Sequence, residues 1–321
     1  MELRKMYVAE LSRLMKQNDK IYILDADLSA AGGTKPLYQE FPDRCVDCGV
    51  AEANMTCIGA GLSASGFVPF VHSFAPFISR RVFDQIAVSI SYSEQNVKIV
   101  AFDPGVTTTY NGGTHMCFED IAMMRALSNI AVLDIVDGFQ LAKALPYIVE
   151  HKGTMYIRIV RKQNDALFDD NYVFHFGKAD KLCDGKDITI VACGTSLFDA
   201  KKATEMLAQK GISVDLLGIH TVKPLDEDAI IESAQKTGKV LTVENHSIHG
   251  GLYSAVCETL SRKHPTLCDG IGVYDKVSQV GNLADLKADY HMSADDSVAK
   301  ALAMLGKEKL TKRKLWTSLP I

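Results

Sequence analysis

The sequence predicts an α/β protein of two domains, each a mostly parallel sheet between two layers of helices. The chain has 321 residues, which exceeds the size of one ordinary hydrophobic core. Short β-rich runs alternate with helical patterns, as in parallel sheets whose crossover connections are helices. The alternation stops once, in a polar stretch, and then resumes. We therefore expect a first domain at 1–163, a linker at 164–187, a smaller domain at 188–309 and a basic tail at 310–321.

The expected elements follow the apolar runs in chain order. In the first domain, the sequence predicts strands at 21–28, 67–74, 97–103, 130–137 and 155–161, with helices beginning near Glu52 and covering 80–92 and 118–127. In the second domain, strands are expected at 188–194, 212–220 and 239–245, and helices at 196–211, 226–238 and 250–263. Each helix separates two strands, so the strands of each domain are expected to run parallel.

Composition excludes several classes of protein. A hydrophobic content of 47%, a charged content of 23% and a net charge of -4 are typical of a globular protein and give no reason to expect nucleic acid or an anionic membrane as partner. No apolar run approaches the roughly 20 residues that span a bilayer, and the amphipathic first 17 residues do not have the apolar core of a signal peptide. Eight scattered cysteines suggest free thiols, so a cytoplasmic location is expected.

Candidate functional residues follow three predicted strands. Glu52 begins a helix, Phe74 and Phe77 lie at a strand end, and His115 lies in a glycine-flanked loop. Each has an ordinary explanation, because acids are favoured in the first turn of a helix and phenylalanines usually pack in a core. Ligands of open α/β sheets, however, bind along the carboxyl edge of the strands, where these residues would converge.

Two glycine-containing segments invite a nucleotide-binding interpretation that we set aside. The glycines of 59–66 fall inside a predicted helix, where they allow close packing, whereas a dinucleotide loop places them in the turn that opens the helix. The turn at 192–196 could hold an anion on its amides, but it stays unassigned because such turns are usually only turns.

An ordered set of motifs resembles the transketolase family. "GVAEANM" (49–55), "PFVHSFAPFISRRVFDQI" (69–86) and "NGGTHMCFEDIAMMRALSNI" (111–130) resemble its pyrimidine-binding domain, and "LLGIHTVKPLDEDAII" (216–231) and "VENHSIHGGLYSAV" (243–256) resemble the C-terminal domain that follows. The family marks its diphosphate and magnesium site with Gly-Asp-Gly and a later Asn, a pair that this sequence does not contain. The chain therefore resembles the C-terminal subunit of a split transketolase.

The resemblance implies thiamine diphosphate as the cofactor, with Mg²⁺ held mainly by a diphosphate-binding partner subunit and no metal ligands in this chain. Glu52 matches the acid that hydrogen-bonds the pyrimidine N1′ and so lets the cofactor's own amino group act as a base. Phe74 and Phe77 match the aromatic residues packed on the pyrimidine ring, and Asp27 matches an acid near the thiazolium.

Four further residues are implied to contact the substrate. His115 matches a catalytic histidine that contacts the ketose hydroxyls, and Arg161 matches an arginine that binds the substrate's phosphate. Asp103 stands where many transketolases carry a histidine, and Asn111 where they carry an aspartate. Because an acid repels a phosphate, these two departures leave open which sugars react and whether they are phosphorylated.

The resemblance implies transfer of a two-carbon ketol unit from a ketose (phosphate) to an aldose (phosphate). It also implies two copies of each subunit, since one cofactor spans both kinds of chain and closed twofold symmetry is common. Two enzymatic alternatives are a deoxyxylulose-phosphate synthase-like subunit and a 2-oxo acid dehydrogenase beta-like subunit. A third alternative is a partner subunit without catalytic function, against which the complete set of Glu52, Phe74, Phe77 and His115 argues.

Overall fold

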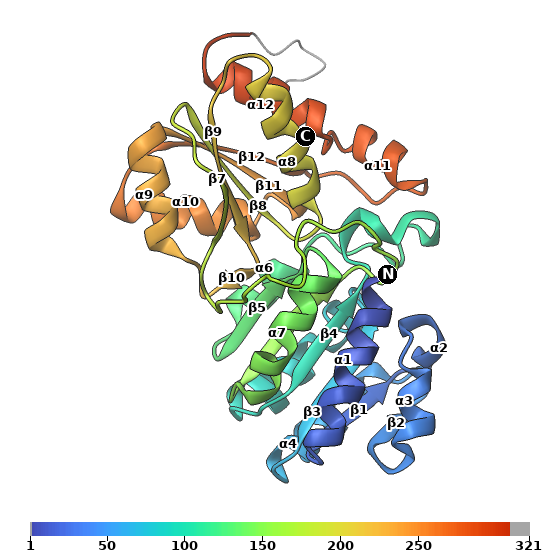
Figure 1. Cartoon of the computed structure of the whole chain (residues 1–321). Helices are drawn as coiled ribbons and strands as arrows, with labels where there is room; N and C mark the ends of the chain where they lie inside the picture. The colour runs from blue at the N-terminus through green and yellow to red at the C-terminus, as the bar shows by residue number, and fades with distance from the viewer. Residues whose placement is uncertain (1, 309–321) are drawn as a thin grey trace.

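The computed structural model describes residues 2–308, and it divides them between two α/β domains, each built on its own sheet (Figure 1). The predicted basic tail at 310–321 lies outside the described residues. In the described part of the chain, no helix is long and apolar enough to cross a membrane.

The first sheet has seven strands in the order β10-β5-β6-β4-β3-β1-β2. Its strands are β1 (Ile21–Asp25), β2 (Cys45–Asp47), β3 (Val68–Phe74), β4 (Lys98–Phe102), β5 (Ile130–Asp134), β6 (Thr154–Ile159) and β10 (Thr221–Lys223). All pair in parallel except β10, which comes from the second half of the chain and pairs antiparallel with β5. The sheet is thus the mostly parallel one that the sequence predicts, with an added edge strand that the sequence did not indicate.

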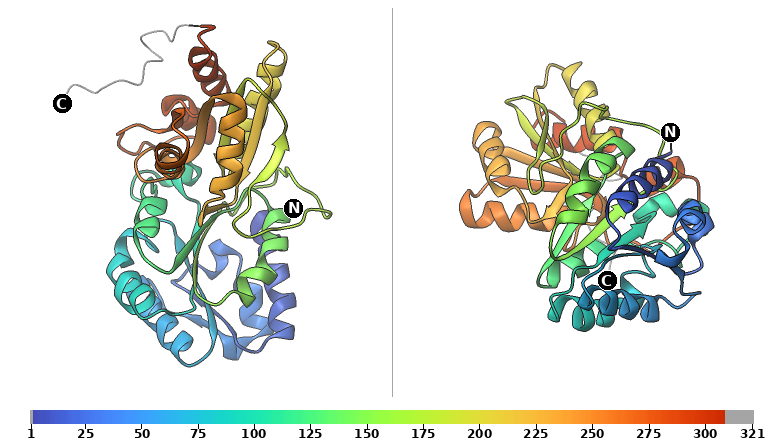
Figure 2. Two further views of the ribbon diagram at one scale, coloured as in Figure 1. Left: turned by 90° about the vertical axis from the view of Figure 1, so that its left-hand side faces the viewer. Right: turned by 60° about the horizontal axis from the view of Figure 1, so that its bottom comes forward.

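Helices cover both faces of this sheet (Figures 1 and 2). They are α1 (Leu3–Gln17), α2 (Ser29–Gly32), α3 (Lys35–Glu40), α4 (Glu52–Ala64), α5 (Phe83–Gln85), α6 (Asp120–Ala126) and α7 (Gly138–Glu150), with short 3-10 segments η1 (Pro42–Arg44), η2 (Arg80–Val82) and η4 (Gly105–Asn111) and a π-helical segment η3 (Ile86–Tyr92). Alternate side chains of the buried strands pack on α1 and α7 on one face and on α4 and η3 on the other.

The second sheet has five strands in the order β12-β11-β8-β9-β7. Its elements are β7 (Asp180–Cys183), β8 (Ile188–Cys193), α8 (Ser196–Ala208), β9 (Val214–Ile219), α9 (Glu227–Thr237), β11 (Lys239–Ser247), α10 (Leu252–Lys263), β12 (Leu267–Val273), α11 (Leu283–Asp289) and α12 (Ala294–Met304). Helices α8 and α12 pack on one face, and α9 and α10 on the other. Strand β7 lies within the stretch expected to be a linker, and it pairs antiparallel with β9.

Helix α4 shows why the glycines of 59–66 do not form a nucleotide loop. Gly59 lies within the helix, and a Cβ atom there would come within 2.9 Å of Val71 on β3. Glycine therefore lets the helix approach the sheet closely, as the sequence analysis predicted. This approach brings the first residue of the helix, Glu52, over the carboxyl end of β3.

A buried charge cluster joins the two sheets. Arg158 on β6 donates to Asp120 (2.9 Å), to Asp134 (2.6 Å) and to the backbone oxygen of Asn245 on β11 (2.9 Å). Asn245 in turn binds the backbone of the loop after β4, where a Cβ on Gly105 would lie 2.1 Å from its Oδ1. Arg158 is fully buried, and Asp120 and Asp134 compensate its charge at the junction. The contacts of Asn245 hold the second sheet against the loop that carries His115.

Burial shifts the pKa values of two further groups at this junction in opposite directions. Burial raises the pKa of Glu244 to about 7 and lowers the pKa of His246 to about 4. Glu244 therefore lowers the stability of the fold as the pH rises from 4.5, the usual pKa of a glutamate, to about 7. His246 raises the stability as the pH rises from about 4 to 6.5, the usual pKa of a histidine. Where these two pH ranges overlap, the two contributions oppose each other.

Candidate functional site

The candidate site lies at the carboxyl edge of β3, where Phe74 ends the strand and Phe77 follows one turn later. The two half-buried rings meet edge to face with centroids 6.3 Å apart. His115, from the loop after β4, approaches both, with ring centroids 5.5 Å from Phe74 and 5.0 Å from Phe77. The structure therefore brings together three of the residues that the sequence predicted for one crevice.

Glu52 supplies a buried carboxylate beside this aromatic group. The residue is 2% exposed, although it is the first residue of α4 and acids at that position are usually solvated. Ser73 donates to its Oε1 at 3.3 Å, and Arg81 donates to its Oε2 at 2.7 Å. The guanidinium of Arg81 also lies over the Phe77 ring, 4.2 Å from its centroid. Acid, cation and aromatic face thus form one continuous contact.

Arg81 is a functional candidate that the sequence alone does not reveal. Its position depends on the 3-10 segment η2, which follows β3 and turns the arginine back toward α4. The segment "SRRVFD" contains two adjacent arginines, and nothing in their spacing distinguishes them. In the structure Arg80 pairs with Glu119 at 3.0 Å, whereas Arg81 pairs with Glu52. The predicted convergence of Glu52 with two phenylalanines was nevertheless a usable signal, because an acid buried among aromatic rings requires a counter-charge nearby in space.

Arg161 and Asp103 form a second buried pair at the same edge. Asp103 follows β4 in the left-handed backbone region (φ 48°), and its Oδ2 accepts from Arg161 Nε at 2.8 Å and Nη2 at 2.5 Å. The remaining guanidinium nitrogen donates to the backbone oxygen of Ala31 at 2.8 Å, and the group lies 4.6 Å from the centroid of Phe74. Asp103 therefore neutralises the arginine, which leaves the phosphate-binding role of Arg161 a prediction.

Asp27 and Asn111 are exposed at the rim of this edge. Asp27 lies just past β1 with a left-handed backbone (φ 56°), and its N–H donates to Asp47 Oδ1 at 2.9 Å. Asn111 ends η4 four residues before His115. In the part of the chain that the structure describes, no hydrogen bond or ion pair ties either side chain to the aromatic group, so their contacts with cofactor and substrate stay predictions.

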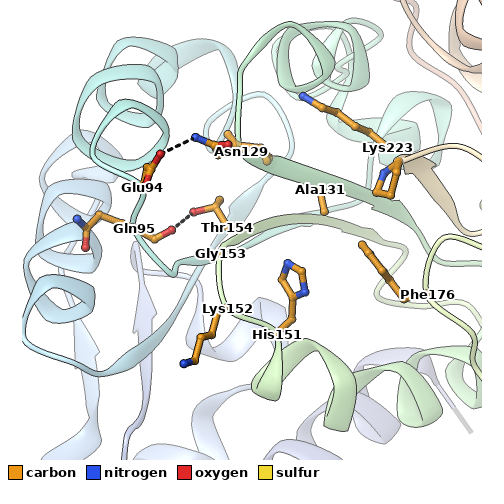
Figure 3. Close-up of a pocket in the computed structure, with 12 residues that line it drawn as sticks. Glu94, Gln95, Asn129, Ala131, His151, Lys152, Gly153, Thr154, Phe176 and Lys223 are labelled. Carbon is orange, nitrogen blue, oxygen red and sulfur yellow. Dashed lines mark hydrogen bonds between the residues drawn. The ribbon is translucent and has the colours of Figure 1, made fainter.

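A separate cavity of about 520 Å³ lies at the opposite edge of the sheet (Figure 3). Its lining includes Ile130 and Thr154, the first residues of β5 and β6, together with His151, Phe176 and Lys223. Parallel strands carry their ligands at the carboxyl edge, and this cavity lies at the amino edge. None of its described lining residues belongs to the group around Glu52, so it is distinct from the candidate site.

Comparisons with known proteins identify the family of both domains. The pyrimidine-binding domain of transketolase matches residues 1–165, and the transketolase C-terminal domain matches residues 177–296. A 6-deoxy-6-sulfo-D-fructose transketolase subunit of Clostridium sp. is 44% identical over 93% of both chains. An apulose-4-phosphate transketolase subunit of Phocaeicola vulgatus is 34% identical, over 95% of this chain and 97% of its own length.

A solved structure gives the same result. A split gene transketolase in the form of an inactive beta4 tetramer superimposes with a TM-score of 0.87 and 36% identity, covering 96% of this chain and 99% of its own. Both domains of the family are thus present in this chain, in the order and over the length found in subunits of split enzymes. The chain belongs to the transketolase family.

Proposed function

We propose that this chain is the pyrimidine-binding subunit of a two-subunit, thiamine diphosphate-dependent transketolase. The observation that carries the proposal is the convergence of Glu52, Phe74, Phe77 and His115 at one sheet edge. An acid beside a flat aromatic wall suits a planar nitrogen heterocycle, because the wall takes the ring face and the acid takes a ring nitrogen. A histidine on the same wall can reach a substrate bound next to the ring.

The residues present fit the cofactor's aminopyrimidine. A planar, cationic guanidinium already stacks on Phe77 while donating to Glu52, so a planar group of this kind is sterically and electrostatically accepted there. Thiamine diphosphate, when bound, supplies the electron sink for cleavage of the carbon–carbon bond of a ketose. Glu52 would hold the proton shared with N1′ of the pyrimidine, and the two rings would exclude water from that hydrogen bond.

His115 would act on the substrate. Its Nδ1 is 2.9 Å from the Thr114 hydroxyl, which fixes the imidazole on one side. Its Nε2 forms no hydrogen bond within residues 2–308 and can therefore exchange a proton with a hydroxyl of the sugar. Asp103, Asn111 and Arg161 would contact the rest of the sugar, and Asp27 would contact the thiazolium side of the cofactor.

The diphosphate and Mg²⁺ would be bound mainly by the partner subunit, in an assembly of two copies of each chain. Relatives of similar length that are themselves subunits support this division. The solved inactive beta4 tetramer supports the further expectation that this chain alone has no activity. A cytoplasmic location is consistent with eight cysteines that all remain free thiols.

The donor is expected to be a ketose with an anionic terminal group. The two named relatives act on a sulfonated and a phosphorylated sugar, so both anions are candidates. Because Asp103 already neutralises Arg161, other groups would bind part of the substrate's anion. This agrees with Asp103 and Asn111, which differ from the histidine and aspartate of many transketolases.

The test is co-purification with the native partner, followed by a donor screen with thiamine diphosphate and Mg²⁺. The screen compares 6-deoxy-6-sulfo-D-fructose, apulose 4-phosphate, fructose 6-phosphate and fructose, and measures the shortened aldose by NMR. Aldose formation that requires both subunits, the cofactor and an acceptor aldose is the expected result. Decarboxylation of a 2-oxo acid without ketose cleavage would instead identify a 2-oxo acid dehydrogenase-like subunit.

A further inference from the structure

Arg81 makes two contacts at once that an ordinary surface arginine would not need. Its Nη1 lies 2.7 Å from Glu52 Oε2, and its guanidinium carbon lies 4.2 Å from the centre of the Phe77 ring. The arginine side chain is 47% exposed, whereas that of Glu52 is 3% exposed. The cation therefore reaches in from solvent and covers the carboxylate and the ring face together.

The buried carboxylate explains why a cation is held there. Glu52 Oε1 receives one neutral hydrogen bond, from Ser73 at 3.3 Å, and Arg81 is the cation paired with it among residues 2–308. A buried anion without a counter-charge is costly, so the chain needs Arg81, or another planar group that shares a proton with the carboxylate, in this position.

We propose that Arg81 occupies the slot of the aminopyrimidine while the cofactor is absent, and that thiamine diphosphate displaces it. This inference rests on the proposed function. Both groups are planar, both stack on an aromatic ring, and both share a proton with a carboxylate. Both groups would take the same face of Phe77 and the same oxygen of Glu52, so they compete for one place. The half-exposed arginine can swing into solvent without leaving a buried charge behind, since the cofactor takes over Glu52.

Competition has a measurable consequence for affinity. The apparent dissociation constant of the cofactor is the intrinsic one divided by the fraction of sites free of Arg81. A partly exposed arginine–glutamate pair shifts such an equilibrium by up to about fivefold. Removal of the guanidinium should therefore tighten cofactor binding by up to that factor. Removal of a residue that only helps to bind the cofactor would weaken binding instead.

The experiment titrates thiamine diphosphate into the assembled two-subunit enzyme with Mg²⁺ and measures the dissociation constant by calorimetry. Arg81→Met is compared with Arg262→Met, which removes an exposed arginine paired with Glu227 at 2.8 Å on the second domain. We expect the Arg81→Met dissociation constant to fall about fivefold and the Arg262→Met value to equal that of the parent. Arg81→Lys retains the charge but not the planar face, so it gives an intermediate value and serves if the methionine variant does not fold.

A cycle with Glu52→Gln isolates the competition. Once the carboxylate is gone, Arg81 keeps only a neutral hydrogen bond and the face of Phe77, so adding Arg81→Met to the Glu52→Gln enzyme should lower its dissociation constant by less than it does in the parent. A dissociation constant that rises or stays at the parental value in Arg81→Met overturns the inference while the proposed function stands. Absence of cofactor binding by the parental assembled enzyme would instead overturn the proposed function, and the displacement with it.

Discussion

Replacing Glu52 with glutamine separates the chemical role of this residue from its structural role. Glutamine has nearly the same shape, and its amide oxygen can still accept from Arg81 or Ser73, which bind the carboxylate at 2.7 and 3.3 Å. The lost charge weakens one pair whose arginine is half exposed, so the free energy of unfolding of the isolated chain should fall by about 0.2–1 kcal/mol.

The effect on the assembled enzyme should be much larger. An amide cannot share a proton with the pyrimidine N1′, and general acid–base groups typically contribute about 10²–10⁴-fold. This loss corresponds to about 3–5 kcal/mol of activation free energy, several times the stability effect. The assay is the rate at which the C2 proton of bound thiamine diphosphate exchanges with deuterium, measured by quenched-flow NMR, beside urea unfolding of the isolated chain.

The matched control is Glu258→Gln. Glu258 also pairs with an arginine at 2.7 Å (Arg125), but it is 59% exposed and lies on the second domain. This variant should keep both the parental exchange rate and the parental stability within experimental error. Exchange of the C2 proton by Glu52→Gln at the parental rate would refute a chemical role for Glu52, as would an exchange defect that disappears once the unfolded fraction is taken into account.

Three further predictions concern the second buried pair, the junction of the domains and the assembly. Arg161→Met leaves the buried Asp103 unpaired and should lower the free energy of unfolding by about 3–5 kcal/mol in urea titrations, most of which Asp103→Asn should restore in the double variant; a single variant as stable as the parent contradicts the pairing. In Glu244→Gln the opposing carboxyl contribution is gone, so stability should increase by about 2 kcal/mol more than in the parent between pH 4.5 and 6.5, as His246 loses its proton in the unfolded state; parallel pH profiles of the two proteins would show that Glu244 is ionised throughout this range. Light scattering of the reconstituted enzyme should give the mass of two copies of each subunit, and a fully active one-to-one heterodimer would show that twofold symmetry is dispensable.

The sequence was sufficient for the fold because its signals are local. Apolar runs and helical patterns located eight of the twelve strands found in residues 2–308 and the helices α4, α6, α8, α9 and α10, whereas α1, α7, α11 and α12 were not predicted. The order of Glu52, the phenylalanine pair and His115 predicted that these residues gather at one sheet edge. The pattern at 80–92 predicted one helix, whereas the structure has a 3-10 turn, a short α-helix and a π-helical segment there. Apolar spacing distinguishes a helix from a strand, but it does not resolve these helix types, whose periods differ little.

What the sequence did not reveal depends on contacts between distant segments. Strand β10 has three residues and is defined by its antiparallel pairing with β5 of the first domain. Strand β7 lies in a polar stretch and is defined by its pairing with β9. The same holds for Arg81, whose contact with Glu52 crosses 29 positions, and for the Asp103–Arg161 pair, which crosses 58. Local patterns predict the elements, whereas the pairing of charges requires their arrangement in space.

The central claim is that this chain contributes the activating acid to a cofactor whose diphosphate is bound by another chain. The most direct measurement is the C2 proton exchange rate of thiamine diphosphate with Mg²⁺ in three samples: this chain alone, the partner alone, and the two together. The account predicts the uncatalysed rate in the first two samples and acceleration by orders of magnitude in the third. Accelerated exchange with this chain alone would contradict it, as would a mixture that binds the cofactor but exchanges no faster than free thiamine diphosphate.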